Sequence, residues 1–306
     1  MPSRQVNRLD HYELLDFGGG RKLERFGRIS LDRCSPAAED FPRFMNDWSK
    51  TDLRLDDRGD VMRGRTPIGD WPVEIANMHF NLKLTPFGHV GVFPEQAENW
   101  KWLQSLGDSF TTPAKTLPQA LNLFAYTGGS TMALAKAGFE VVHLDASVPA
   151  VRWARDNAAN NDLQDHPIRW IVEDARKFTA REIKRGRRYH VIVLDPPSFG
   201  HGPSGDRWQI EADLYPLLES CLQLLHDEAH LLLTAHSVTP SPADIIDWLE
   251  DTTNQLSANQ LSTSSNATSQ DAGNRRCTIT SKRLTLVDRN QRHLDSGFSI
   301  RLAKQQ

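Results

Sequence analysis

The sequence lacks the features of disulfide-stabilised, metal-cluster and membrane proteins. Its 306 residues include three cysteines, Cys34, Cys221 and Cys277, which are far apart and form no C-x-x-C pair. We therefore expect neither a disulfide framework nor a metal site. The N-terminus has no apolar core like that of a signal peptide, and no run of about 18 apolar residues occurs. These absences favour a soluble, cytoplasmic protein with no membrane partner.

An excess of charge of one sign is also absent. Lysine and arginine total 36 against 39 for aspartate and glutamate, so the formal net charge is -3. The net charge of the chain therefore does not favour nucleic-acid binding through counterion release, and any contact with nucleic acid must come from a local basic patch. With 39% hydrophobic and 25% charged residues, the composition is that of an ordinary globular protein.

From about Thr116 onward, short apolar runs alternate with helix-like stretches at intervals of roughly 20 to 30 residues. This alternation is typical of βαβ units on a parallel sheet and predicts an α/β fold. The expected strands are residues 121–124, 140–144, 169–172, 190–194 and 230–234, and the expected helices are 130–137, 148–161, 207–225 and 243–250.

The two ends of the chain differ from this pattern. Residues 1–115 are broken by glycine and proline into short β-like pieces, and we interpret them as a small β-rich N-terminal subdomain that binds substrate. Residues 116–306 form the main domain. Its segments 278–287 and 296–302 alternate apolar and polar residues, which predicts an antiparallel hairpin that closes the sheet. The polar segment 252–274 is expected to be a mobile loop.

A ligand site is expected at the carboxyl ends of the predicted strands. The segment LNLFAYTGGSTMALAKAG joins a buried strand to a helix through a turn in which Gly128 and Gly129 permit close approach of a ligand. Asp145, Asp174 and Asp195 follow the next three strands, so three carboxylates share one edge of the sheet. At the second strand end, an acidic side chain such as Asp145 can bind both ribose hydroxyls of a nucleoside cofactor.

The identity of this cofactor is inferred from two missing motifs and from charge. The turn has no third glycine of G-x-G-x-x-G, and no G-x-x-x-x-G-K-[ST] loop occurs, so a dinucleotide or a nucleoside triphosphate is disfavoured. A rim of carboxylates disfavours phosphate and suits a nucleoside with positive charge. S-adenosylmethionine, with its sulfonium and amino groups, fits this description.

The same motifs carry a family resemblance. NLFAYTGGSTMALAKAG, VVHLDAS, RWIVEDARKF and VIVLDPPSFGHGP, with FGHVGVFPEQAENW upstream, resemble the class I methyltransferases related to bacterial 23S rRNA cytosine methyltransferases, over about residues 77–237. The resemblance implies a Rossmann-like sheet of order 3-2-1-4-5-7-6 with an antiparallel last strand. It also implies that Asp145 binds the ribose and Asp174 the adenine amine. The family's RNA-binding PUA domain has no counterpart in this chain.

The resemblance further implies a set of donor contacts. Gln96 matches a glutamine of the family pattern G-F-x-x-D-Q-R, but Glu95 and Ala97 replace the aspartate and arginine on either side of it. The full set of residues expected around S-adenosylmethionine is Gln96, Phe124, Ala125, Tyr126, Thr127, Gly128, Asp145, Ala146, Ser147, Asp174, Ala175 and Asp195.

The segment after the fourth strand favours methyl transfer to nitrogen. Asp195-Pro196-Pro197-Ser198-Phe199 resembles the motif of amino-methyltransferases, in which the aspartate and a proline carbonyl accept hydrogen bonds from an amine and the aromatic ring stacks on the base. The prolines restrict φ and keep the carbonyls in place. We therefore expect Asp195, Pro196, Pro197 and Phe199 to be catalytic.

Methylation at cytosine C5 has a different requirement, because a cysteine thiolate must first add to C6. The related cytosine enzymes carry this cysteine in a T-C-S-like stretch after the fifth strand, where the present chain has Thr234-Ala235-His236-Ser237. Cys221 is expected in the core, and Cys34 in a loop of the N-terminal subdomain. His236 is interpreted as a polar residue of the rim that could accept a proton.

The substrate is expected to be RNA, most simply ribosomal RNA. Seven basic residues occur between Arg176 and Arg188, and we interpret the last four as an RNA contact: Lys184, Arg185, Arg187 and Arg188. A solvated helix end is the structural alternative. Cytosine-C5 methylation, methylation of a protein amide and a non-catalytic nucleotide- or RNA-binding module stay open as alternatives, and a nicotinamide oxidoreductase is the least favoured. The sequence leaves the oligomeric state open.

Overall fold

The computed structural model describes residues 11–45, 47–67, 69–85, 88–110, 116–203, 205–236, 239–263 and 276–305. The chain divides into two compact units by its internal contacts. Unit 1 comprises residues 1–101, 155–164 and 284–296, and unit 2 comprises residues 102–154, 165–283 and 297–306. The sequence predicts a single boundary at residue 115, and it does not predict that residues 155–164 and 284–296 belong to unit 1. None of the helices in the described ranges is both long enough and apolar enough to cross a membrane.

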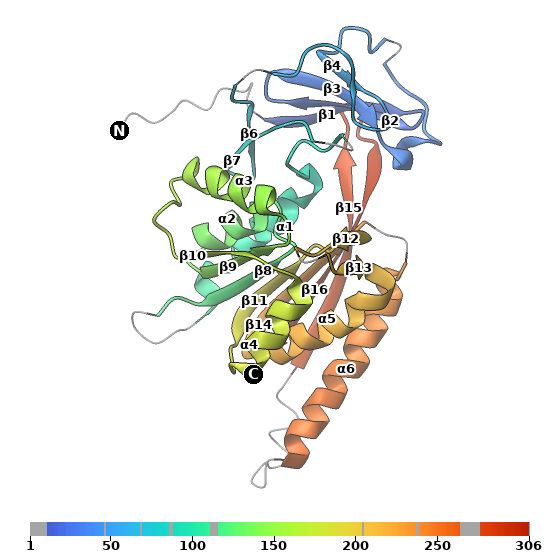
Figure 1. The fold of residues 1–306 in the computed structure, drawn as a ribbon. Coiled ribbons are helices and arrows are strands. Elements are labelled where there is room, and N and C mark those ends of the chain that lie inside the picture. Colours follow the sequence, from blue (N-terminus) through green and yellow to red (C-terminus); the bar gives the residue numbers. More distant parts are fainter. Residues whose placement is uncertain are drawn as a thin grey trace. The chain divides into compact units, whose positions relative to one another are not determined.

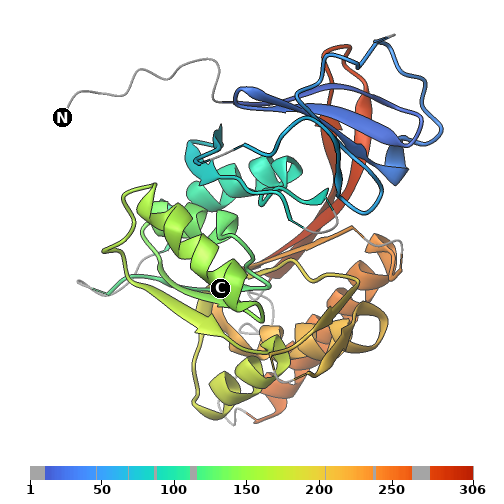
Figure 2. The same cartoon turned by 45° about the horizontal axis from the view of Figure 1, so that its top comes forward.

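The central element of unit 2 is a seven-stranded sheet, which Figures 1 and 2 show from two directions. Its strands lie in the order β10-β9-β8-β11-β14-β16-β15. Counted along the chain from β8, this order is 3-2-1-4-5-7-6, as the resemblance implies. Strands β10, β9, β8, β11 and β14 run parallel to one another, whereas β16 runs antiparallel to β14. The strands are β8 Gln119–Leu123, β9 Glu140–Asp145, β10 Ile168–Val172, β11 Tyr189–Leu194, β14 Leu225–Ala235, β15 Arg276–Val287 and β16 His293–Gln305.

The central strands form because their side chains are apolar on both faces. In β8 and β11 nearly every residue is buried, as expected for a parallel sheet covered by helices on both sides. Helices α4, α5 and α6 pack on one face, where Phe178, Leu218 and Leu249 join the main core cluster with sheet residues. Helices α2 and α3 lie on the other face (Figures 1 and 2). The helices are α2 Gly129–Lys136, α3 Val148–Ala159, α4 Ala175–Lys184, α5 Ile210–Leu224 and α6 Pro242–Thr263.

Two elements of unit 2 correct the sequence-based expectations. The helix expected from residue 207 begins at Ile210, because Arg207–Gln209 forms strand β13 and pairs with β12, Phe199–His201. The loop expected from residue 252 is helical up to Thr263, since α6 continues that far. Leu256 lies about two turns after Leu249 on the same helical face and packs against the core cluster, so this apolar stripe explains the longer helix. Residues 264–274 of the expected loop lie outside the described residues.

Unit 1 contains a five-stranded sheet of order β1-β2-β3-β4-β5 and a two-stranded sheet of β6 and β7. It also holds most of helix α1, which follows a short 3-10 turn, Pro94–Gln96. Residues 284–296, which end β15 and begin β16, belong to this unit, where Leu286 and Leu294 share a small core cluster with Leu14 and Phe17. The elements are β1 Tyr12–Gly18, β2 Arg21–Phe26, β3 Ile29–Cys34, β4 Leu53–Leu55, β5 Val61–Arg63, β6 Pro72–Ile75, β7 Met78–Asn81 and α1 Ala97–Gln104.

Candidate functional site

The turn after β8 has an unusual backbone conformation. Phe124, Tyr126 and Gly128 all have positive φ, at 54°, 46° and 90°. Positive φ is costly for residues with a Cβ and is concentrated at functional sites, where the surrounding structure enforces it. A Cβ at Gly128 would lie 3.1 Å from the Cβ of Ala154, so glycine also permits α3 to pack closely here. The turn lies at the carboxyl edge of the sheet, between the ends of β9 and β11.

Asp145 ends β9 beside this turn, and two backbone amides orient its carboxylate. Its Oδ2 accepts a hydrogen bond of 2.8 Å from the Tyr126 amide, and its Oδ1 accepts one of 2.8 Å from the Ser147 amide. Burial raises the pKa of Asp145 above its usual value, although these two amides act in the opposite direction. No ion pair in the described part of the chain involves Asp145. Each oxygen therefore keeps a lone pair for an uncharged donor such as a hydroxyl group.

Apolar side chains flank Asp145 at the same edge. Val148 begins α3 and is 54% exposed, and Val172, which is opposite Asp145 in the β9–β10 pair, is 38% exposed. Both valines are suited to contact a planar ring bound next to the carboxylate. Neither valine is among the residues expected from the sequence, because exposure at a strand end cannot be read from the sequence.

Asp174 is engaged within the protein to a greater degree than expected. It caps α4, where its Oδ1 accepts from the amides of Arg176 and Lys177, and the Arg176 guanidinium bonds both carboxylate oxygens. Burial opposes ionisation, but these contacts outweigh it and lower the pKa of Asp174. Arg176 also pairs with Asp213 at 2.8 Å. Asp174 therefore adds little net negative charge to the rim, although its Oδ2 has room for one further donor.

Asp195 follows β11 and is held by a neighbouring strand. The Thr234 hydroxyl of β14, which is buried, donates to Asp195 Oδ1 at 2.5 Å. The next residues are fixed by Trp208 of β13, whose indole N–H donates to the Pro197 carbonyl at 2.6 Å. Phe199 is 52% exposed, so its ring is accessible to a ligand.

Trp208 also contacts the turn after β8, in addition to the segment that follows β11. Its ring lies 4.8 Å from that of Phe124, in the turn after β8, and the Arg176 guanidinium lies 5.9 Å from its ring centre. Thr234 and Trp208 were absent from the residues predicted from the sequence. Trp208 was assigned to a helix, and Thr234 was identified only as a neighbour of the missing cysteine.

Comparison with known proteins gives the chain a family. A crystal structure of the SAM-dependent methyltransferase from Agrobacterium tumefaciens is 31% identical, with a TM-score of 0.81 over 99% of this chain and 95% of that one. The chain belongs to the S-adenosylmethionine-dependent methyltransferases. A candidate SAM-dependent methyltransferase from Streptococcus mutans, 14% identical with a TM-score of 0.70 over 97% of this chain and 76% of that one, shares the fold. No protein-family model matches the chain.

Among curated proteins, this methyltransferase is similar to enzymes named for ribosomal RNA. It is 32% identical over 146 residues to ribosomal RNA large subunit methyltransferase I of Aeromonas salmonicida, a match covering 47% of this chain and 35% of the relative. The enzyme of the same name from Salmonella newport is 25% identical over 202 residues, which are 65% of this chain and 48% of the relative. The chain thus spans about a third to a half of the length of these relatives.

The methyltransferase has no cysteine at the position that C5 chemistry requires. Thr234 and Ala235 end β14, His236 follows, and Ser237 lies outside the described residues. Cys221 is fully buried in α5, where burial raises the pKa of its thiol far above the usual value. Cys34 is exposed on β3 of unit 1, and Cys277 is exposed on β15. None of the three lies in the segment directly after β14.

The basic segment lies away from the carboxyl edge, and Gln96 belongs to unit 1. Gln96 is buried in unit 1 and accepts a 2.9 Å hydrogen bond from Asn99. Lys184 ends α4, and Arg185, Arg187 and Arg188 lie in the turn before β11, whereas Asp195 follows that strand. Because a strand rises about 3.3 Å per residue, the six residues of β11 separate the basic segment from Asp195 by roughly 20 Å.

Many of the basic residues in this segment are already paired. Arg185 pairs with Glu182 at 2.9 Å and Lys177 with Asp206 at 2.6 Å, while Arg181 pairs with Glu173 and Arg176 with two carboxylates. Lys184, Arg187 and Arg188 are exposed, and the described residues offer them no ion pair. The segment therefore presents fewer uncompensated charges than its sequence indicates.

Proposed function

We propose that this methyltransferase transfers a methyl group from S-adenosylmethionine to an exocyclic nitrogen of a base in RNA, and that its substrate is ribosomal RNA. The observation that carries the proposal is the Asp195–Phe199 segment, which lies at the carboxyl edge beside the turn after β8. The similarity to curated enzymes named for ribosomal RNA supports the choice of substrate.

The carboxyl edge fits S-adenosylmethionine in its chemistry. Asp145 is a buried carboxylate that is oriented by two amides, so it can accept hydrogen bonds from both hydroxyls of a ribose. Val148 and Val172 would contact the adenine ring, and Asp174 Oδ2 would accept from the adenine amine. Phe124 to Gly128, with Ala146, Ser147 and Ala175, would line the rest of the donor site. When bound, the cofactor supplies a methyl group on a sulfonium, which is open to in-line attack by a nitrogen lone pair.

The acceptor side provides hydrogen-bond acceptors for an amine. A carboxylate has about four lone-pair positions, so Asp195 can accept an amine hydrogen while the Thr234 hydroxyl holds its orientation. The proline carbonyls offer a second acceptor in a backbone that Trp208 keeps fixed. These bonds would orient the nitrogen lone pair toward the donor methyl group, and the exposed Phe199 ring would stack on the base.

The absence of a suitable thiol makes nitrogen the favoured acceptor. The cysteine that methylation at cytosine C5 needs has no counterpart at Ala235 or His236, at the end of β14, and Cys221 is too deeply buried to ionise. An exocyclic amine needs no covalent activation by the protein, so orientation by Asp195 and the prolines suffices.

Lys184, Arg185, Arg187 and Arg188 would contact the RNA backbone away from the target base. Because they lie roughly 20 Å from Asp195, such a contact requires several nucleotides on one side of the target. Replacing all four with glutamate should weaken RNA binding and flatten its salt dependence. An unchanged salt dependence would remove these residues from the RNA-binding surface.

The direct test is transfer of labelled methyl groups from S-adenosylmethionine into RNA and protein from cells that lack this gene. We expect label in nuclease-sensitive material, its loss in an Asp195→Ala variant, and an N-methylated nucleoside by mass spectrometry. 5-Methylcytidine as the product would contradict the nitrogen acceptor. Label found only in protease-sensitive material would move the acceptor to a protein side chain.

A further inference from the structure

Unit 1 displays a short apolar segment between β3 and β4. Within residues 41–45, Phe44 is 58% exposed, Met45 is 40% exposed and Phe41 is 39% exposed. Single exposed apolar side chains are common on protein surfaces and need no explanation. Three of them within five residues, on a backbone fixed by hydrogen bonds, indicate a preorganised ligand-binding surface.

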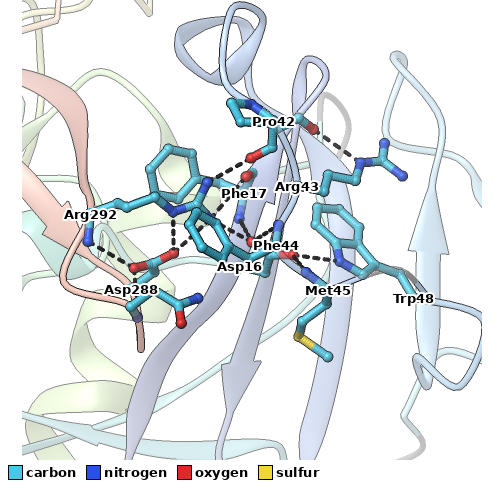
Figure 3. A network of polar contacts seen from close by, with 11 residues as sticks. Asp16, Phe17, Pro42, Arg43, Phe44, Met45, Trp48, Asp288 and Arg292 are labelled. Atoms are coloured by element: carbon cyan, nitrogen blue, oxygen red, sulfur yellow. Dashed lines mark hydrogen bonds and ion pairs between the residues drawn. The ribbon is translucent and has the colours of Figure 1, made fainter.

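A buried carboxylate holds the backbone of this segment (Figure 3). Asp16 of β1 is completely buried and accepts from the amides of Phe44 at 3.2 Å and Met45 at 2.8 Å, and from the Trp48 indole at 3.0 Å. The end of β1 lies against the segment, since a Cβ at Gly18 would lie 2.6 Å from the backbone nitrogen of Arg43. The segment is therefore ordered without a ligand, and a ligand does not have to supply that ordering free energy.

Arg292 lies between the rings of Phe17 and Phe44 and packs on the Phe44 ring. The Arg292 guanidinium lies 4.2 Å from the ring centre of Phe17 and 4.3 Å from that of Phe44, and it donates to Asp16 and to the Pro42 carbonyl (Figure 3). One face of the Phe44 ring is thus occupied by Arg292. With more than half of this side chain exposed, the ring can accept another planar group on the outside.

Two arginines lie in the same part of unit 1, and the Asp47 carboxylate is close enough to one of them, Arg63, for an electrostatic interaction. Arg43 donates to the Gly18 carbonyl and lies 4.3 Å from the ring centre of Trp48, and Arg63 of β5 donates to the carbonyls of Trp48 and Thr51. No ion pair in the described ranges involves either of them. An open aromatic face next in sequence to an arginine without a described ion pair, here Arg43, is typical of surfaces that bind single-stranded nucleic acid.

We infer that Phe44 is a stacking platform for an unpaired base of the RNA substrate, with Arg43 beside it to contact a phosphate. This contact site is additional to the one at which the methyl group is transferred, and the inference rests on the proposed function for the identity of its ligand. Glu39 and Asp40 precede the segment, so stacking rather than charge supplies most of the affinity. An apolar protein partner would need no arginines here, and for that reason RNA is the favoured ligand.

The test is binding of a fluorescently labelled single-stranded RNA of mixed sequence and of large-subunit rRNA fragments to the full chain. Because loss of stacking on an aromatic side chain costs about fivefold or more in affinity, Phe44→Ala should weaken binding by at least that factor. Phe44→Trp should retain it. Met62→Ala is the matched control, since Met62 is 66% exposed on β5 of the same unit and lies outside the segment.

The salt dependence separates the two residues. Phe44→Ala should leave the slope of log affinity against log salt unchanged, whereas Arg43→Ala should reduce its magnitude by about 0.7, the value for one phosphate on a single strand. Equal binding by Phe44→Ala and the unaltered protein, or an equal loss in Met62→Ala, would overturn the platform. If the unaltered protein methylates RNA while one of these two binding results is found, the platform is overturned and the proposed function stands. Label from S-adenosylmethionine in protein alone would overturn the proposed function, and with it the assignment of RNA to this platform.

Discussion

Replacing Thr234 with valine tests whether Asp195 must be held in one orientation. Valine has nearly the shape of threonine, so the change removes the hydroxyl that donates to Asp195 Oδ1 at 2.5 Å and leaves the packing of a buried position almost intact. Hydrogen bonds to charged groups contribute about 1.5–3 kcal/mol. If all of this is lost in the transition state, the rate of methyl transfer falls by about 10- to 150-fold.

The assay is single-turnover methyl transfer to RNA, with S-adenosylmethionine binding measured by calorimetry on the same preparations. Thr234→Val should lower kcat by a much larger factor than it raises the Kd for S-adenosylmethionine, because Asp145, which Thr234 does not contact, is assigned the main donor contact. Thr234→Ser keeps the hydroxyl and should retain most of the activity. A Thr234→Val enzyme that transfers methyl groups at the rate of the unaltered protein would refute the assignment of Thr234 as a positioning residue.

Three further predictions concern the donor site, unit 1 and pH. Asp145→Asn should weaken S-adenosylmethionine binding by about tenfold or more in calorimetry, because the asparagine NH2 group replaces one of the two carboxylate oxygens that accept hydrogen bonds. Arg292→Met should destabilise the protein by about 3–5 kcal/mol in denaturant unfolding, since it leaves buried Asp16 without its cation, and adding Asp16→Asn should cost less than the sum of the two changes. Burial, and to a smaller extent His226, lower the pKa of His190 to about 4. Between pH 6.5 and 4 the unfolded chain therefore binds more protons than the folded protein. The melting temperature should fall as the pH is lowered through this range, and it should fall less steeply in a His190→Gln variant.

The strands of the large sheet could be predicted because a parallel strand covered on both faces is apolar along its whole length. The expected strands at 140–144 and 190–194 differ from β9 and β11 by a single residue at one end. The three aspartates at strand ends follow from the same pattern. Their separate roles do not, because the pairing of Asp174 with Arg176 and the isolation of Asp145 from cations depend on side-chain placement.

Local sequence was insufficient where tertiary contacts determine the conformation. Arg207–Gln209 has the composition of a helix start, but pairing with β12 and the bond from Trp208 to Pro197 hold it as a strand. The polar end of α6 resembles a loop in composition, yet Leu256 continues the apolar stripe of the helix onto the core. The limits of unit 1 depend on contacts between residues that are far apart in the chain, such as those of Asp16 with Arg292.

The bond between Asp16 and Arg292 has a consequence for the order in which the chain can fold during synthesis. Domains usually fold as they leave the ribosome, beginning at the N-terminus. Here the first-made sheet contains a buried carboxylate whose cation is made 276 residues later, after all the strands of the large sheet except β16. The N-terminal sheet is therefore completed near the end of translation, and a ribosome-bound chain that stops before residue 284 should expose this sheet to proteases although unit 2 lacks only its last strands.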